Sequence, residues 1–232
     1  MSELKHCTDL GSLFKIWKEA QEKEADNEYN KYKFGNVDKS SFCVDGIVDT
    51  SVSDNQRELL FIAKECNCGG KDISSYVNNQ SDKFWLTSIC KNQNSKERTI
   101  FSDRLAMLAN AYYNNDFTNA NEKKNNYDYL KLVSFINLNK RGGYSRSNSK
   151  TIKTYTKIYS RFIAEEINIL APSLIVCCGR DAYSYFNRYV LKNINNTTQK
   201  IVFQYHPSYW AISDENYIKK FGVSVKSAFD NN

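Results

Sequence analysis

Histidine and proline are scarce in this sequence, which holds two of each among 232 residues. So few histidines argue against a Cys/His metal site, and the pair Cys66 and Cys68 lacks the second half of a zinc pattern. Neither a Walker loop nor a G-x-G-x-x-G segment is present, so ordinary nucleotide-cofactor binding has no support. We therefore expect a protein that works without a metal ion or cofactor.

Long hydrophobic runs are absent as well. No segment approaches the ~20 apolar residues of a membrane span, and the polar N-terminus has no signal-peptide stretch. The seven cysteines are an odd number, which favours reduced thiols over a disulfide framework. These absences predict a cytoplasmic protein that does not contact membranes, and we expect it to be a monomer.

Acidic residues are missing from residues 131–164, which contain eight lysines and arginines. Tyrosine, serine and glycine lie among them. This composition suits phosphate contacts, which supply most of the affinity of proteins for nucleic acids. The simpler alternative is a solvated helix face. Because no acid in the stretch offsets the charge, we favour a nucleic-acid surface.

Four apolar runs predict buried strands at 59–63, 132–136, 174–178 and 200–205. Helices are predicted between and around them, at 10–32, 72–79, 83–91, 99–113, 150–170, 180–191 and 214–229. Strands that are apolar on both faces and alternate with helices predict an α/β fold, a three-layer α/β/α arrangement around a four-stranded parallel sheet. We divide the chain into an N-terminal helical and loop extension packed on the core, 1–55, and an α/β domain, 56–232.

The segment His206-Pro207-Ser208-Tyr209-Trp210 directly follows the last predicted strand. Since proline cannot continue a strand ladder, the chain turns there and leaves an imidazole, a hydroxyl and two aromatics at a strand end. Ligands bind at the carboxyl ends of strands in open α/β sheets. The other three predicted strands end near Lys64, Glu65, Asn67, Asn137, Asn139 and Gly179. Each residue has a purely structural alternative, but together they predict a site.

This ordered set resembles the uracil-DNA glycosylase superfamily. Its members carry a first-strand loop such as G-Q-D-P-Y or G-E-x-P-G, a later strand that ends in Asn, an L-x-P-K-x-I-V-x-x-G segment, and H-P-S. The corresponding stretches here read AKECN at 63–67, FIN at 135–137, LAPSLIVCCG at 170–179 and HPS at 206–208. The resemblance spans roughly residues 59–221 and implies a uracil-DNA glycosylase-like fold.

The resemblance also implies a monofunctional DNA N-glycosylase, which flips a base out of the duplex and leaves an abasic site. Glu65 would stabilise an oxocarbenium-like sugar and position water, and His206 would donate a hydrogen bond to the departing base. The base pocket would be formed by Asn67, Asn137 as the reader of the base edge, and Tyr76 or Trp85 as the stacking aromatic. Contacts to DNA would come from Lys140, Arg141, Arg146, Ser208, Tyr209 and Trp210.

Four departures from the superfamily pattern are present, and one of them bears on the substrate. The first loop has Ala63 in place of glycine and Cys66 in place of proline, and the cysteine spacing of the iron–sulfur members is missing, which predicts no cluster. Asn67 stands where strict uracil enzymes have a tyrosine that blocks the pyrimidine 5-position. We hypothesise that the substrate is uracil or a 5-substituted pyrimidine, such as a modified base of foreign or phage DNA.

Two other functions stay open at this point. One is a catalytically silent nucleic-acid-binding module on the same fold. The other is a hydrolase that cleaves the N-glycosidic bond of free nucleosides or nucleotides. The basic stretch argues against the second alternative, because a small substrate needs no extended phosphate track.

Overall fold

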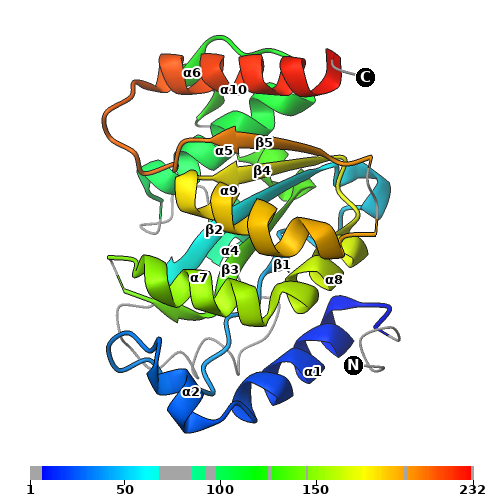
Figure 1. The fold of residues 1–232 in the computed structure, drawn as a ribbon. Coiled ribbons are helices and arrows are strands. Elements are labelled where there is room, and N and C mark those ends of the chain that lie inside the picture. Colours follow the sequence, from blue (N-terminus) through cyan, green and yellow to red (C-terminus); the bar gives the residue numbers. More distant parts are fainter. Residues whose placement is uncertain are drawn as a thin grey trace.

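The centre of the molecule is a mixed five-stranded sheet in the order β1-β3-β2-β4-β5 (Figure 1). The computed structural model describes residues 7–67, 85–91, 98–124, 127–144, 146–195 and 198–230. The strands are β1 (Gly46–Ile47), β2 (Leu59–Asn67), β3 (Val133–Gly143), β4 (Leu174–Cys178) and β5 (Lys200–Gln204). β3, β2, β4 and β5 are parallel, whereas β1 runs antiparallel to β3 at the edge. The α/β class is confirmed. The prediction of a wholly parallel, four-stranded sheet is wrong, because β1 adds a fifth, antiparallel strand.

Helices lie on both sides of this sheet (Figure 1). On one side are α4 (Trp85–Lys91), α5 (Ile100–Tyr113), α6 (Ala120–Lys123) and α10 (Asp214–Asp230). On the other are α1 (Leu10–Glu22), α7 (Ser149–Ile158), α8 (Ser160–Leu170) and α9 (Arg180–Tyr185). Helix α2 (Asp26–Asn30) and single turns at Asp54–Gln56, Asp128–Leu132, Phe186–Val190 and Leu191–Asn193 complete the described part. The helix predicted at 72–79 lies outside the described residues.

The two central strands of the sheet are buried on both faces. Along β2, Leu59, Phe61 and Ala63 belong to the core under α5 and α10, and Leu60 and Ile62 belong to the opposite core. The side chains of β4 alternate in the same way between the two cores. Alternation on a strand that is apolar throughout is the pattern of a sheet covered on both sides, as the sequence predicted.

The N-terminal extension is part of this structure rather than an appendage. Helix α1 buries Leu13, Phe14 and Trp17, and the Trp17 ring stacks on Phe162 of α8 with ring centroids 5.4 Å apart. Downstream of α1, residues 46–47 form β1 and pair with β3. Residues of the extension therefore pack against α8 and supply the edge strand, which the sequence did not indicate.

Several elements differ in length from their predictions. The predicted helix at 10–32 is divided into α1 and α2, and β2 continues to Asn67, four residues beyond its predicted end. The helix predicted at 150–170 is broken at Tyr159 into α7 and α8, and the buried Tyr159 hydroxyl donates a hydrogen bond to Glu24 at 3.2 Å. Strand β3 runs to Gly143, seven residues beyond the predicted end at 136, and is buried over its whole length. The extra residues of β3 place several predicted site residues in the interior.

Candidate active site at the carboxyl edge of the sheet

The carboxyl ends of the four parallel strands lie along one edge of the sheet. In chain order these strands are β2, β3, β4 and β5, so the spatial order β3-β2-β4-β5 reverses direction between β2 and β4. A ligand crevice in an open α/β sheet lies outside the strand ends at this kind of reversal. The segment 64–67 of β2, Gly179 after β4 and His206 after β5 all lie at this edge.

Gly179 allows the segment after β5 to approach β4 closely. Its φ of +103° is a backbone conformation that residues with a side chain rarely adopt. Its N–H donates a 2.7 Å hydrogen bond to the carbonyl of Gln204. A Cβ atom at this position would lie 3.4 Å from Cβ of His206. The glycine between β4 and α9 therefore brings the backbone of His206 against the reversal point.

His206 is held as a neutral imidazole with a defined tautomer. Burial and the nearby Lys64 ammonium lower the pKa of His206 to about 4. The backbone N–H of Ser208 donates to Nδ1 at 3.2 Å, so the proton of the neutral ring resides on Nε2. Nε2 has no hydrogen-bond partner among the described residues. The geometry supplies a hydrogen-bond donor at the sheet edge.

The loop that carries His206 is clamped by Arg104 of α5, a residue that sequence reasoning missed. The nearly buried Arg104 guanidinium donates hydrogen bonds to the carbonyls of Pro207 (3.0 Å), Tyr209 (2.7 Å) and Ile212 (2.7 Å). It also pairs with Asp214 at 2.8 Å. Arginine in an amphipathic helix usually reaches solvent, and no local pattern marks this one as buried. The clamp fixes the loop backbone and leaves Ser208, Tyr209 and Trp210 exposed, Trp210 at 86%.

Phe101 of α5 is the aromatic side chain that the structure brings to His206. The two ring centroids lie 5.4 Å apart, and Phe101 also contacts Phe135 of β3 edge to face. Of the two aromatics that the sequence suggested, Tyr76 and the side chain of Trp85 lie outside the described residues. Most apolar residues of α5 form its buried face, so in the sequence Phe101 does not stand out from residues that pack in the core.

Glu65 and Asn139 form a carboxylate–amide pair on neighbouring strands. They are register partners of β2 and β3, and Asn139 Nδ2 donates to Glu65 Oε2 at 3.0 Å. Asn139 is itself held, since its Oδ1 accepts the N–H of Arg141 at 3.1 Å. The Glu65 carboxyl group also lies over Gly143, where a Cβ atom would come within 2.4 Å of it. Two residues of β3 therefore orient the carboxylate.

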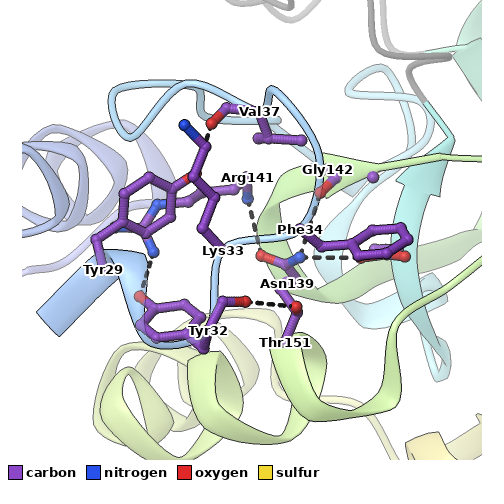
Figure 2. A pocket seen from close by; sticks show the side chains of 11 residues that line it. Tyr29, Tyr32, Lys33, Phe34, Val37, Asn139, Arg141, Gly142 and Thr151 are labelled. Carbon is purple, nitrogen blue, oxygen red and sulfur yellow. Dashed lines mark hydrogen bonds between the residues drawn. The ribbon is translucent and has the colours of Figure 1, made fainter.

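Glu65 and Asn139 line a pocket of about 290 Å³, a volume that includes its open mouth (Figure 2). Its other walls come from β3, from Thr151 of α7, and from the N-terminal extension through Tyr29, Tyr32, Lys33, Phe34 and Val37. Asn67 ends β2 as an exposed residue and pairs with Gly143 of β3. The pocket combines a carboxylate, an amide and aromatic rings beside the end of β2.

Asn137, predicted to read the base edge, does not lie at a strand end. It sits in the middle of β3, is nearly buried, and donates hydrogen bonds to Asp45 from its backbone N–H (2.7 Å) and its side chain (3.2 Å). β3 continues past Asn137 because residues 43–45 of the extension supply hydrogen-bond partners along its outer edge. At this edge the Cys43 N–H donates to the carbonyl of Lys140. Asn139, two residues on, is the amide that meets Glu65.

Lys140 and Arg141 are not exposed DNA contacts, which corrects the sequence-based prediction. The fully buried Lys140 pairs with Asp45 and, at 2.8 Å, with Glu166 of α8. Burial alone would lower the pKa of Lys140, but the two carboxylates outweigh it and raise that pKa. Burial raises the pKa of Glu166 well above its usual range, against the opposing effect of Lys140. These groups hold β3, α8 and the extension together.

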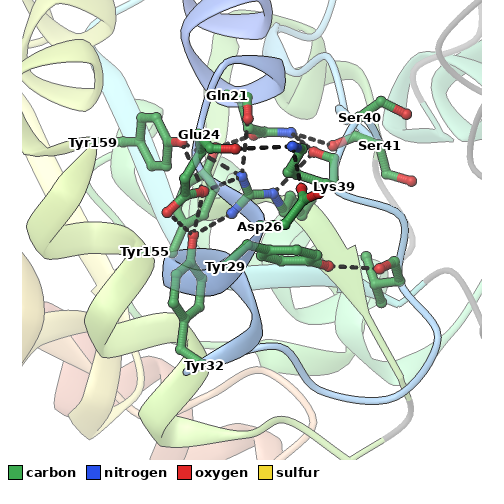
Figure 3. A network of polar contacts seen from close by, with 12 residues as sticks. Gln21, Glu24, Asp26, Tyr29, Tyr32, Lys39, Ser40, Ser41, Tyr155 and Tyr159 are labelled. Carbon is green, nitrogen blue, oxygen red and sulfur yellow. Dashed lines mark hydrogen bonds and ion pairs between the residues drawn. The ribbon is translucent and has the colours of Figure 1, made fainter.

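The Arg141 guanidinium is enclosed by tyrosine rings, which Figure 3 labels. It pairs with Glu24 at 2.5 Å and lies 4.5–5.7 Å from the ring centroids of Tyr29, Tyr32, Tyr155 and Tyr159. Of the three basic residues predicted to contact DNA, only Arg146 is exposed. The sequence contained no sign that acids from outside the basic stretch would neutralise the other two.

Comparison with known proteins adds no family to these observations. No protein-family model matches the chain, and no curated protein matches it either. Within the described residues, no group of three or more His, Cys, Asp or Glu side chains is arranged to hold a metal ion. In the same part of the chain, no helix has the length and hydrophobicity needed to cross a membrane. The function is therefore argued from the site itself.

Proposed function

We propose that this protein is a DNA glycosylase that hydrolyses the N-glycosidic bond of a flipped-out pyrimidine and leaves an abasic site. The observation that carries the proposal is the neutral His206, whose Nε2 proton is available at the sheet edge that also carries Glu65. The ordered segments that resemble the uracil-DNA glycosylase superfamily support the same assignment. The segment that contains the carboxylate ends β2, and the segment that contains the histidine follows β5.

His206 serves the leaving group in this reaction. When the bond between C1′ and the base nitrogen breaks, the base takes both electrons and becomes an anion. A neutral imidazole that donates from Nε2 stabilises this charge by a hydrogen bond, without a competing positive charge in the ground state. Lys64 and burial keep the ring neutral at physiological pH, because they hold its pKa near 4.

Glu65 acts on the sugar and on the attacking water in this proposal. The carboxylate stabilises the positive charge that develops on the sugar ring, and it accepts a proton from the water that adds to C1′. The hydrogen bond from Asn139 Nδ2 fixes the orientation of this carboxylate. Glu65 thereby combines electrostatic stabilisation with the positioning of water.

The base pocket consists of Asn67, Asn139 and Phe101 in this proposal. Asn139 supports this pocket by holding Glu65, since its Nδ2 donates to Glu65 and to the Gly142 carbonyl and its Oδ1 accepts from Arg141. Phe101 provides an aromatic surface next to His206. Asn67 is smaller than tyrosine and leaves room for a substituent at the pyrimidine 5-position. Tyr209 and the highly exposed Trp210 lie where a duplex would cross the edge, with Ser208 and Arg146 available to its phosphates.

The decisive experiment measures base release. Purified protein is incubated with duplexes that contain uracil, a thymine mismatch, hydroxymethylcytosine or its glucosylated form, and strand breaks are counted after alkali treatment. We expect breaks on at least one substrate, and we expect Glu65→Gln and His206→Ala to abolish them. Glu122→Gln, an exposed carboxylate of α6, is the matched control and should keep full activity. Intact strands on every substrate would overturn the proposal, and retained binding would then identify a silent binding module.

A hydrolase of free nucleosides is a second candidate, favoured by one observation. The burial of Lys140 and Arg141 removes two of the three basic residues that were expected to hold DNA beside the site. Release of free base from nucleosides, followed by chromatography, tests this candidate. Faster cleavage of a nucleoside than of any duplex would favour it over the glycosylase.

A further inference from the structure

The outer side of α7, α8, α9 and the turns after α9 is strongly basic. Residues 146–195 contain eight basic and three acidic residues, and all eight basic residues are exposed. None of the three acids is fully exposed: Glu166 is buried, and Glu165 and Asp181 are partly covered. We call this surface the basic face; it consists of Arg146, Lys150, Lys153, Lys157, Arg161, Arg180, Arg188 and Lys192.

The lysines of α7 form a row. Lys150, Lys153 and Lys157 are exposed, whereas Ile152, Tyr155 and Thr156 are buried against the sheet side. At a helical rise of ~1.5 Å per residue, their positions are about 4.5 Å and 6 Å apart along the helix axis. This spacing is of the order of the ~3.4 Å axial rise between phosphates along one DNA strand. A row of charges suits a linear polyanion better than a flat anionic surface.

The row begins at the edge of the sheet that holds the candidate active site. Helices α7 and α9 both start there, and Ser149 Oγ donates to Asp181 Oδ2 at 2.6 Å, which joins their first turns. Lys150 and Arg180 flank this contact on the exposed side. The basic face therefore extends from the site along the outside of the helical layer, as the positions of α7, α8 and α9 in Figure 1 show.

The charge of the α7 lysines in this face is not paired with an acid among the described residues. Lys131, Lys140 and Arg141 of the same acid-free stretch form ion pairs with Asp128, Glu166 and Glu24. The three α7 lysines form no ion pair with a described residue. Three like charges on one helix face repel one another slightly. A polyanion bound there would reduce this electrostatic repulsion, which remains in the folded protein.

We propose that the basic face binds the phosphate backbone of duplex DNA away from the reaction site, independently of base release. The choice of DNA among linear polyanions rests on the proposed function, but binding by this face does not require catalysis. Its contribution is electrostatic and independent of sequence, because lysine and arginine contacts to phosphates carry no base information.

The test measures binding of an unmodified, fluorescently labelled 30-base-pair duplex by anisotropy over a range of salt concentrations. The variant replaces Lys150, Lys153 and Lys157 by glutamine. Each lost phosphate contact lowers the slope of log K against log salt by about 0.9, so the slope should fall by about 2.7 and affinity at 0.1 M salt by roughly tenfold or more.

The matched control places the same charge change on the other side of the sheet. Lys219, Lys220 and Lys226 are exposed on α10, and their replacement by glutamine should leave the slope unchanged. Equal losses in both variants would overturn the proposal in favour of a general charge effect. Loss of binding to vesicles of anionic lipid, or to duplex RNA alone, with duplex DNA unaffected, would also overturn it.

A second measurement uses the wild-type protein. Mass spectrometry after lysine acetylation should show protection of Lys150, Lys153 and Lys157 by the duplex and none for the α10 lysines. Because the unmodified duplex has no base to release, its binding is measured without turnover. A protein that binds through this face and releases no base would refute the proposed function and leave this proposal standing, whereas unprotected α7 lysines would refute the proposal itself.

Discussion

Lys140 and Lys150 belong to the same acid-free stretch, yet one is fully buried and the other exposed. Lys140 lies in β3, between Asp45 of the extension and Glu166 of α8. Lys150 lies on the outer side of α7 with no acid within ion-pair distance in the described part of the chain. The comparison shows that two positive charges of one segment lie in different environments, one within the core and the other at the surface.

The largest expected effect separates the two lysines by stability. Lys140→Met should lower the free energy of unfolding by about 3–5 kcal/mol, because it leaves two buried carboxylates without their cation. Lys150→Met should change it by less than about 0.5 kcal/mol, as expected for an exposed substitution. Urea titration of both variants measures the difference. Adding Asp45→Asn to Lys140→Met should recover part of the loss, and equal losses for the two single variants would contradict the comparison.

Arg141→Lys sharpens the comparison by keeping the charge. The buried guanidinium lies 4.5 Å from the ring centroid of Tyr29 and donates to Glu24, and an ammonium does not reproduce the planar donor geometry or the ring contact of a guanidinium. We expect a loss of about 2 kcal/mol in the free energy of unfolding, measured in urea. Arg146→Lys at an exposed position is the control and should be near neutral. A near-neutral Arg141→Lys would mean that charge alone matters there.

His206 shows how a largely buried basic group titrates when no described carboxylate pairs with it. Whereas Lys140 keeps its charge, burial and the nearby Lys64 ammonium lower the pKa of His206 to about 4. In His6→Gln only one histidine remains, so NMR can follow it directly, and its signal should shift with a midpoint near pH 4. Lys64→Met should move this midpoint upward. A midpoint near the usual histidine value would contradict the neutral, Nε2-protonated ring.

The same titration affects stability with a defined sign. Between the usual histidine pKa and about 4, the unfolded chain binds a proton that the folded protein does not. As pH falls through this window, His206 therefore favours unfolding by up to about 1.4 kcal/mol for each pH unit. Comparison of urea titrations of the wild-type protein and His206→Asn across this window isolates the contribution.

The smallest expected effect is that of the surface lysines on folding. Replacing Lys150, Lys153 and Lys157 together by glutamine should change the free energy of unfolding by less than about 1 kcal/mol and should leave the circular dichroism spectrum unchanged. This result is what makes the DNA-binding test interpretable. A large loss of stability would show that the α7 lysines support the fold, as Lys140 does.

The sequence predicted the apolar centre of the fold well because periodicity records burial. β4 occupies the predicted residues 174–178, and α10 begins at its predicted residue, Asp214. The predictions failed where polar residues are buried by partners distant in the chain. β3 continues through Asn137 and Lys140 because Asp45 accepts a hydrogen bond from Asn137 and forms an ion pair with Lys140. Nothing in the sequence near residue 137 indicates that residue 45 lies beside it.

The candidate site was predictable only in part for the same reason. The strand ends located Glu65 and His206, since proline and polar residues mark where a strand stops. The choice of Asn137 over Asn139 depended on the length of β3, which a distant carboxylate determines. Phe101 and Arg104 come from α5, and contacts between a helix and a loop that lies a hundred residues later leave no local signal.

The Arg104 clamp has a consequence for how this protein can change over evolutionary time. Arg104 grips the loop after β5 through carbonyl oxygens, a group that every residue type possesses. Ser208, Tyr209 and Trp210 can therefore be exchanged without loosening the backbone that presents His206. Substitutions in this loop can therefore change the exposed side chains around His206 while the backbone scaffold stays intact.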